Sequence, residues 1–104
     1  MWMVSLKALR DFWTAGHARA EAPLMDWYKA AERAEWESIA GVRTTFPSAD
    51  GGVKVGSGNL VTVFNIGGNA YRLVASIHYN TRKAFILRVM THAEYGKNKW
   101  KVRL

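Results

Sequence analysis

Apolar residues recur every three to four positions through the first part of the chain, a spacing typical of amphipathic helices. The first helix is predicted over Ser5–Trp13, with Ser5 as its N-cap. A short strand is predicted just before it, over Trp2–Val4. The run Ala15-Gly16-His17 then interrupts the periodicity and ends this helix.

A second helix is predicted to carry Pro23 in its first turn, where a missing N–H costs no hydrogen bond. Its apolar stripe ends near Glu35, and Ser38 is expected to cap a third helix over Ile39–Thr45, which Pro47 ends. We expect the tryptophans of this region to pack in the core, with base stacking as the less favoured alternative.

The hydrophobic pattern changes after residue 47 to runs of β-branched and aromatic residues, which predict strands. Ser48–Gly58, rich in Gly, Ser and Asp, predicts a loop with at most a short strand at Val53–Val55. Three longer strands are predicted at Leu60–Ile66, Asn69–Tyr79 and Lys83–His92. The order of elements predicts one α+β domain over residues 1–104, with a short first strand and two to three helices on a C-terminal antiparallel meander.

Gly67-Gly68 predicts a two-residue hairpin, because both central positions of such a turn need positive φ. That turn pairs Ile66 with Asn69 and Val63 with Arg72. On the strand that follows, side chains alternate between the two faces of the sheet. An apolar set is expected to face the helices: Tyr71, Leu73, Ala75, Ile77 and Tyr79. A more polar set is expected to face outward: Arg72, Val74, Ser76 and His78.

Asn80–Arg82 marks the second hairpin, and its length decides where the last strand points its side chains. A loop of three residues pairs Arg72 with Met90, whereas a loop of two residues flips the strand. We predict three residues, because three apolar side chains then join the core: Phe85, Leu87 and Val89. The outward face then holds Arg72, Arg88, Met90 and His92.

Composition narrows the class of function. The 104 residues include no cysteine, which excludes a disulfide framework and a thiolate zinc site and favours a cytoplasmic location. No apolar run is long enough for a membrane helix, and no signal peptide is apparent. The formal charge of +7 favours a polyanionic partner such as nucleic acid, although a basic surface can also serve solubility alone.

The residues 91–95, Thr-His-Ala-Glu-Tyr, place an imidazole, a carboxylate and a phenol where the sheet should end. Arg72 and Arg88 are candidates to hold a phosphate through forked hydrogen bonds, and His92 and Tyr95 to transfer protons to and from RNA. Glu94 could act as a base or could stabilise a short helix. Taken singly, each residue also fits an inert surface or packing role.

Five segments have an order and spacing that are characteristic in combination: Lys7-Ala8-Leu9, Phe46-Pro47-Ser48, Val63 to Asn69, Arg72-Leu73-Val74 and Val89 to Tyr95. Together they resemble the HigB family, toxins of type II toxin–antitoxin systems with a RelE-like fold. The resemblance implies a ribosome-dependent endoribonuclease that cuts mRNA without a metal or other cofactor. It implies attack by the ribose 2′-OH, with Arg72 on the phosphate and His92 and Tyr95 in the proton-transfer positions.

The resemblance also implies a helix-turn-helix antitoxin of the HigA type, through which alone DNA would be contacted. This chain departs from the family pattern at Gly96, where Asp is frequent, at Leu87, where a basic residue is frequent, and at Ala70. An inactive module that only binds RNA or its antitoxin is therefore the alternative. Contacts to mRNA or ribosomal RNA are expected from Lys54, Lys97, Lys99 and Lys101.

Overall fold

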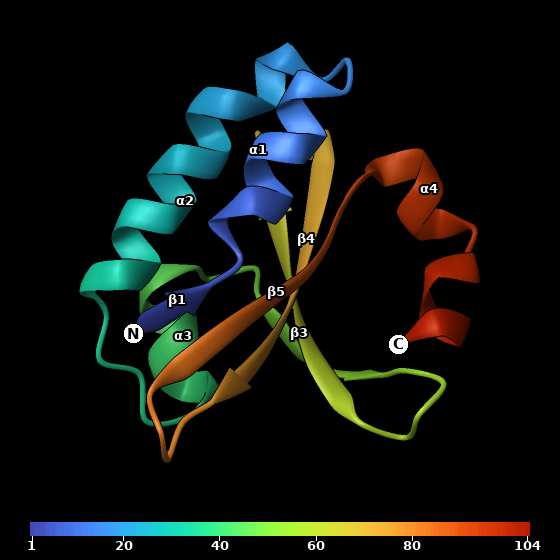
Figure 1. The fold of residues 1–104 in the computed structure, drawn as a ribbon. Coiled ribbons are helices and arrows are strands. Elements are labelled where there is room, and N and C mark those ends of the chain that lie inside the picture. Colours follow the sequence, from blue (N-terminus) through green and yellow to red (C-terminus); the bar gives the residue numbers. More distant parts are fainter.

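The computed structural model describes residues 1–104 and is built on one mixed sheet of five strands (Figure 1). The strands are β1 (Trp2–Val4), β2 (Asp50–Lys54), β3 (Leu60–Ile66), β4 (Tyr71–His78) and β5 (Lys83–Thr91). Their order in the sheet is β1-β5-β4-β3-β2. β1 runs parallel to β5, and all other neighbours are antiparallel. The predicted α+β class and the β3–β5 meander are confirmed, while β2 is longer than the short strand that was expected.

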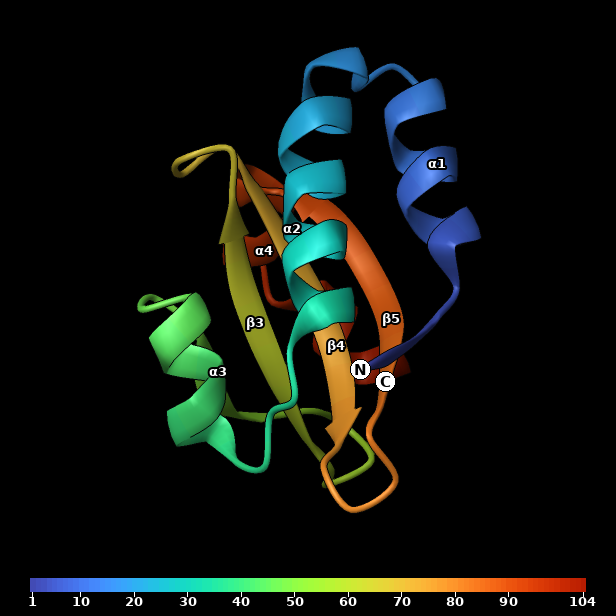
Figure 2. The same cartoon turned by 90° about the vertical axis from the view of Figure 1, so that its left-hand side faces the viewer.

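The two faces of the sheet are covered by different parts of the chain. The helices are α1 (Leu6–Thr14), α2 (Glu21–Arg33), α3 (Ile39–Thr45) and α4 (His92–Gly96), with 3-10 turns at Ala18–Ala20 and Lys99–Arg103. Figures 1 and 2 show α1 and α2 on one face, and α4 with the chain after it on the other. We call residues 92–104 the C-terminal segment. No helix is both long and apolar enough to cross a membrane.

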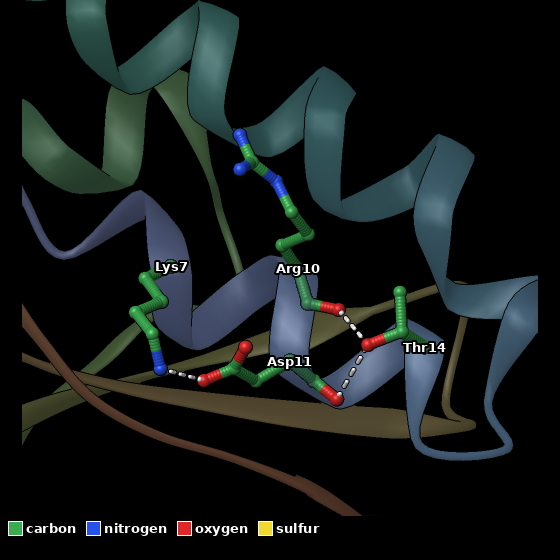
Figure 3. Close-up of polar contacts among 4 residues, drawn as sticks. All are labelled: Lys7, Arg10, Asp11 and Thr14. Atoms are coloured by element: carbon green, nitrogen blue, oxygen red, sulfur yellow. Dashed lines mark hydrogen bonds and ion pairs between the residues drawn. The ribbon is translucent and has the colours of Figure 1, made fainter.

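The local contacts of α1 differ from the predicted capping. Ser5 occupies the N-cap position with φ 81°, and its side chain makes no capping hydrogen bond, nor does that of Ser38 at α3. Instead, Lys7 Nζ lies 2.8 Å from Asp11 Oδ2, and the Thr14 hydroxyl donates to the carbonyl oxygen of Arg10 at 2.8 Å (Figure 3). An exposed pair of this kind contributes at most about 0.5 kcal/mol. The helix is therefore held mainly by its apolar face, where Leu9 is fully buried.

The helix-side core is centred on an aromatic group around Phe64 of β3. The Phe64 ring lies 5.1 Å from that of Trp27, 5.4 Å from that of Phe46 and 6.3 Å from that of Trp36, measured between centroids. Trp27 and Trp36 are each only 3% exposed. The expectation that tryptophans pack in the core is confirmed for these two, whereas Trp2 is exposed.

The β3–β4 register is two residues away from the prediction. Ile66 pairs with Tyr71 rather than with Asn69, and Asn65 pairs with Arg72. Gly67 and Gly68 do adopt positive φ, but the connection has four residues, 67–70, because Asn69 is drawn out of the ladder to accept hydrogen bonds from Arg72. A shift of two residues leaves each side chain on its predicted face.

The β4–β5 register contains two departures that cancel. The loop has four residues, 79–82, so that His78 pairs with Lys83, and a β-bulge at Leu87 then restores the predicted pairing of Arg72 with Met90. Before the bulge, the strand faces are reversed from the prediction. Ile86 therefore joins the helix-side core, and Ala84, which pairs with Ile77, is fully buried on the same face.

The bulge also corrects the expected core positions on β5. Phe85 faces away from the helices and lies 5.0 Å from the His78 ring, and Leu87 packs on the opposite side of the sheet. The prediction that Phe85 and Leu87 join the helix-side core is wrong, whereas Val89 does pack there. An extra residue at a bulge redirects the side chains that precede it, which is the physical reason.

A second, smaller core lies beneath the C-terminal segment. It consists of apolar residues of four strands, one residue just after β2 and one of the C-terminal segment: Val53, Val55, Val61, Val63, Val74, Met90 and Trp100. The face predicted to be open is therefore covered at Arg72 and Val74, and only its Ser76 and His78 end stays accessible. The Gly56 N–H donates to the Lys101 carbonyl at 2.8 Å, which ties the β2–β3 loop to this cover.

Candidate active site

Arg72 lies in the sheet with its guanidinium folded against the β3–β4 turn. Nη1 donates to the carbonyl oxygens of Tyr71 at 3.0 Å and Asn69 at 3.3 Å, and Nη2 donates to Asn69 Oδ1 at 2.6 Å. These bonds use three of the five N–H groups that a guanidinium carries. With 7% of its surface exposed, Arg72 is the one buried charged side chain.

A continuous stack of side chains joins Arg72 to the C-terminal segment. The Arg72 Cζ lies 5.6 Å from the centre of the Tyr95 ring, and that ring stacks on Trp100 at 5.4 Å and 22°. Lys101 Nζ lies over the Trp100 indole, 5.7 Å from the ring centroid. Cations above aromatic faces are attracted by the ring quadrupole, so the stack fixes Tyr95 between a guanidinium and an indole.

Local sequence determines where Tyr95 stands. Thr91 ends β5 and caps α4, accepting from the Glu94 N–H at 3.2 Å, while Glu94 Oε1 accepts from the Thr91 N–H at 3.3 Å. This reciprocal pair is a capping box. Of the two roles considered for Glu94, the structure shows the stabilisation of a short helix.

Tyr95 lies between charges of opposite sign. Burial raises the pKa of the Tyr95 phenol, the negative charge of Asp50 raises it further, and the Arg72 guanidinium lowers it. Four residues form one row across the sheet through successive pairings: Asp50, Val63, Val74 and Arg88. Paired residues share a face, so Asp50 and Arg88 lie on the same face as Val74 and Arg72. A phenol whose pKa is raised keeps its proton at neutral pH, which makes Tyr95 a donor.

Replacing Asp50 with asparagine is expected to lower the pKa of Tyr95, because it removes the charge that opposes ionisation. Alkaline titration of tyrosinate absorbance measures this, with Tyr95→Phe identifying the contribution of Tyr95. The same titration of Asp11→Asn, which removes a carboxylate from α1, should match the unmodified protein. An unchanged Tyr95 curve in Asp50→Asn would contradict the proximity of these two groups.

Arg88 lines a hollow of about 400 Å³ between β5 and the C-terminal segment. Its other lining residues are Val89, Met90, Glu94, Lys97, Lys99, Trp100 and Arg103. The bulge at Leu87 positions Arg88 here, in the row next to Arg72. Arg72, Arg88 and Tyr95 are thus brought to one face, as the sequence predicted.

The other residues predicted for the site do not all lie with Arg72, Arg88 and Tyr95. His92 is exposed at the start of α4, three residues before Tyr95, and its side chain has no hydrogen bond to either arginine. Lys97 and Lys99 line the hollow, and Lys101 lies over Trp100. Lys54 pairs with Leu60 on the edge strand and belongs to the opposite face from Val53, so it is not part of this group. No three His, Asp or Glu side chains converge as metal ligands would.

Two features of this site escaped the sequence reasoning: the approach of Asp50 to Tyr95 and the packing of Trp100 on the sheet. Asp50 stood in a segment read as loop, so no face could be assigned to it. Trp100 stood in a basic stretch, with Arg103, that was expected to contact RNA or to be a solvated end, and no packing role was assigned to it. The signal that was available is that β3 has apolar residues at both parities, Val61 and Val63 at one and Phe64 and Ile66 at the other, because a strand apolar on both faces must be covered on both.

Charge is divided unevenly along the chain. Residues 1–49 contain six Lys and Arg against six Asp and Glu, while residues 50–104 contain nine against two. The whole formal charge of +7 therefore belongs to the part that carries the candidate site. Of the two acids in this part, Glu94 is engaged in the capping box, and Asp50 Oδ1 accepts from the Gly52 N–H at 3.0 Å.

The chain is similar to known proteins over most of its length. Residues 20–98 match the family model of the HigB toxin, described as the RelE-like toxic component of a toxin–antitoxin system. The mRNA interferase toxin HigB of Escherichia coli K12 is 28% identical over 95 residues, covering 91% of this chain and 88% of that protein. The mRNA interferase HigB proteins of Escherichia coli O157:H7 and Shigella flexneri show the same identity and coverage.

The family match covers most of the chain, including β2 to β5 and α4, and the fold has the α+β architecture that the resemblance implied. The description of the family further implies an antitoxin partner. The chain belongs to the HigB family of RelE-like toxins.

Proposed function

We propose that this protein is a ribosome-dependent mRNA endonuclease, an mRNA interferase that arrests translation in the cytoplasm. The observation that carries the proposal is the contact of Arg72 with Tyr95 on the basic face of a HigB-family fold. A buried guanidinium beside a protonated phenol supplies a positive charge and a proton donor at one place.

The proposed reaction needs no metal. The ribose 2′-oxygen attacks the adjacent phosphorus, the bond from phosphorus to the 5′-oxygen breaks, and a 2′,3′-cyclic phosphate and a free 5′-OH result. Tyr95, kept neutral by burial and by Asp50, is suited to protonate the leaving 5′-oxygen. His92 lies three residues away on the same helix, a spacing that brings side chains together, and is proposed to accept the 2′-OH proton.

Stabilisation of the negative charge on the two non-bridging phosphate oxygens is assigned to the two arginines, Arg72 and Arg88. Arg72 retains two N–H groups beyond its three hydrogen bonds, and Arg88 stands in the neighbouring row of the sheet. Lys54, Lys97, Lys99 and Lys101 are proposed to contact mRNA or ribosomal RNA, with Lys54 contributing from the other face. The proposed antitoxin is a helix-turn-helix protein of the HigA type, which would mediate any contact with DNA.

The experiment is induction in a bacterial host, with primer extension on a translated message and growth as the second measurement. The wild-type chain should stop growth and produce new 5′ ends, and His92→Ala should reduce cleavage about a hundredfold or more, the typical contribution of a general acid or base. His78→Ala is the matched control, because His78 is likewise an exposed histidine but lies at the far end of β4 from Arg72.

A second candidate function is a module that binds the ribosome or its antitoxin without cutting RNA. Two observations favour it: three of the five Arg72 donors are already engaged, and His92 has no hydrogen bond to Arg72 or Tyr95. Purified protein that binds programmed ribosomes but leaves the message intact, with His92→Ala behaving identically, would support this function and contradict the nuclease.

A further inference from the structure

The hollow beside Arg88 gathers cations from three parts of the chain. Arg88 comes from β5, Lys97 follows α4, and Lys99 and Arg103 lie in the last 3-10 turn. The single salt bridge of the molecule joins Lys7 and Asp11 on α1, so none of these four cations is neutralised by an ion pair. The one carboxylate at the hollow, Glu94, is held in the capping box by Thr91. The electrostatics therefore favour an anion.

The hollow also has an apolar side. Met90 is 3% exposed and Trp100 is 7% exposed, and both line it. The Trp100 indole is held in place because its Nε1 donates to the Tyr95 carbonyl at 3.1 Å. A volume of about 400 Å³ exceeds what one phosphate group fills and falls within the range of small-molecule sites. The space therefore suits an anion attached to a ring.

The hollow lies next to the pair Arg72 and Tyr95 of the candidate active site. Trp100 stacks on Tyr95, and Tyr95 lies against Arg72, so one ring separates the hollow from the Arg72 guanidinium. An RNA strand whose scissile phosphate lay at Arg72 and Tyr95 would bring a neighbouring nucleotide into the hollow. A cationic surface beside fixed aromatic and apolar groups is the arrangement that binds single-stranded nucleic acid.

We propose that this hollow is a nucleotide subsite, in which Lys97, Lys99 and Arg103 contact successive phosphates of single-stranded RNA and one nucleoside packs against Trp100 and Met90. The inference rests on the proposed function and adds to it a contact that does not need the ribosome. An acidic protein segment is the less favoured occupant, because a carboxylate leaves the apolar side of the hollow without a partner.

The test measures binding without cleavage. A short fluorescent RNA with 2′-O-methyl sugars throughout cannot undergo 2′-OH attack, and its anisotropy with the full chain gives the affinity at several salt concentrations. For single strands, each phosphate contact contributes about 0.7 to the slope of log K against log salt. Replacing Lys99 and Arg103 together with glutamine should lower the slope by about 1.4 and the affinity at least about tenfold.

The matched control removes two exposed cations from α2, on the other face of the sheet, as Lys29→Gln with Arg33→Gln. It changes the net charge equally and should leave most of the affinity and slope intact. If the Lys99 and Arg103 variant melts at a lower temperature, the exposed Lys97→Gln replaces it, with an expected fall in slope of about 0.7.

Three results would overturn the subsite. One is an equal loss in the α2 control, which would indicate only the general charge; another is no binding of the RNA by the wild-type chain. The third is displacement of the RNA by hexaglutamate at a lower concentration than by unlabelled RNA of the same sequence, which would assign the hollow to an acidic protein segment.

Failure of the proposed subsite can be distinguished from failure of the proposed nuclease activity. Specific binding at the hollow with an intact message during translation would contradict the proposed cleavage alone. Cleavage of a translated message with an unchanged salt slope in the Lys99 and Arg103 variant would contradict the subsite alone.

Discussion

Arg72→Gln is expected to lower mRNA cleavage at least about a hundredfold and to lower the free energy of unfolding by about 2 kcal/mol. The stability loss follows because hydrogen bonds from a charged donor to Asn69 and Tyr71 contribute about 1.5 to 3 kcal/mol, and the contact with Tyr95 is lost too. The loss of cleavage is expected to reach at least about a hundredfold, the typical effect of removing one donor that stabilises transition-state charge. Urea unfolding and primer extension measure the two effects.

Arg72→Lys separates charge from geometry. Lysine keeps the positive charge but lacks the planar fork that spans two oxygens, so cleavage should remain more than about tenfold below wild type while stability falls less than in Arg72→Gln. Cleavage at the wild-type rate in a destabilised Arg72→Gln protein would show that Arg72 serves only to hold the β3–β4 turn.

Phe64→Ala is expected to lower the free energy of unfolding by about 3 to 5 kcal/mol, the usual cost of removing a large buried aromatic side chain. Phe64 is 1% exposed and contacts three aromatic rings, those of Trp27, Trp36 and Phe46. These rings are held on α2 and on the segments just before and after α3, so they cannot close the space without moving those segments. Urea denaturation followed by tryptophan fluorescence reports both the loss and the changed surroundings of Trp27 and Trp36.

Leu60→Ala is the control on the same strand. Leu60 is 61% exposed, so its truncation should change the free energy of unfolding by no more than about 0.5 kcal/mol. Equal losses at Phe64 and Leu60 would mean that the aromatic group does not form the centre of the core.

Periodicity and turn chemistry were sufficient for the helices and for β3, β4 and β5, but register was only partly predictable. β5 contains apolar residues at both parities, Phe85 and Leu87 as well as Ile86, so alternation could not reveal the bulge. The predicted pairing of Arg72 with Met90 is nevertheless correct, because the longer loop and the bulge cancel. Local patterns do not determine such compensating shifts, since they depend on tertiary packing.

The candidate site was predictable where chemistry and motif coincided, as at Arg72 and Tyr95. Asp50 was beyond reach, because its approach to Tyr95 depends on the pairing of β2 with β3 in a glycine-rich segment without alternation. The hollow was also beyond reach, because it exists only when Trp100 packs on the valines of β2 and β3. Burial of Arg72 follows from that same cover and could not be inferred from an alternating strand.

The division of charge between the two parts of the chain has a consequence for encounter. A molecule with one neutral part and one strongly basic part behaves as a dipole. The field of a polyanion orients this dipole before contact, so that residues 50–104 face the polyanion. Productive collisions then become more frequent at low ionic strength. The trailing surfaces of α1 and α2 remain turned outward, accessible to a second protein while the basic face is occupied.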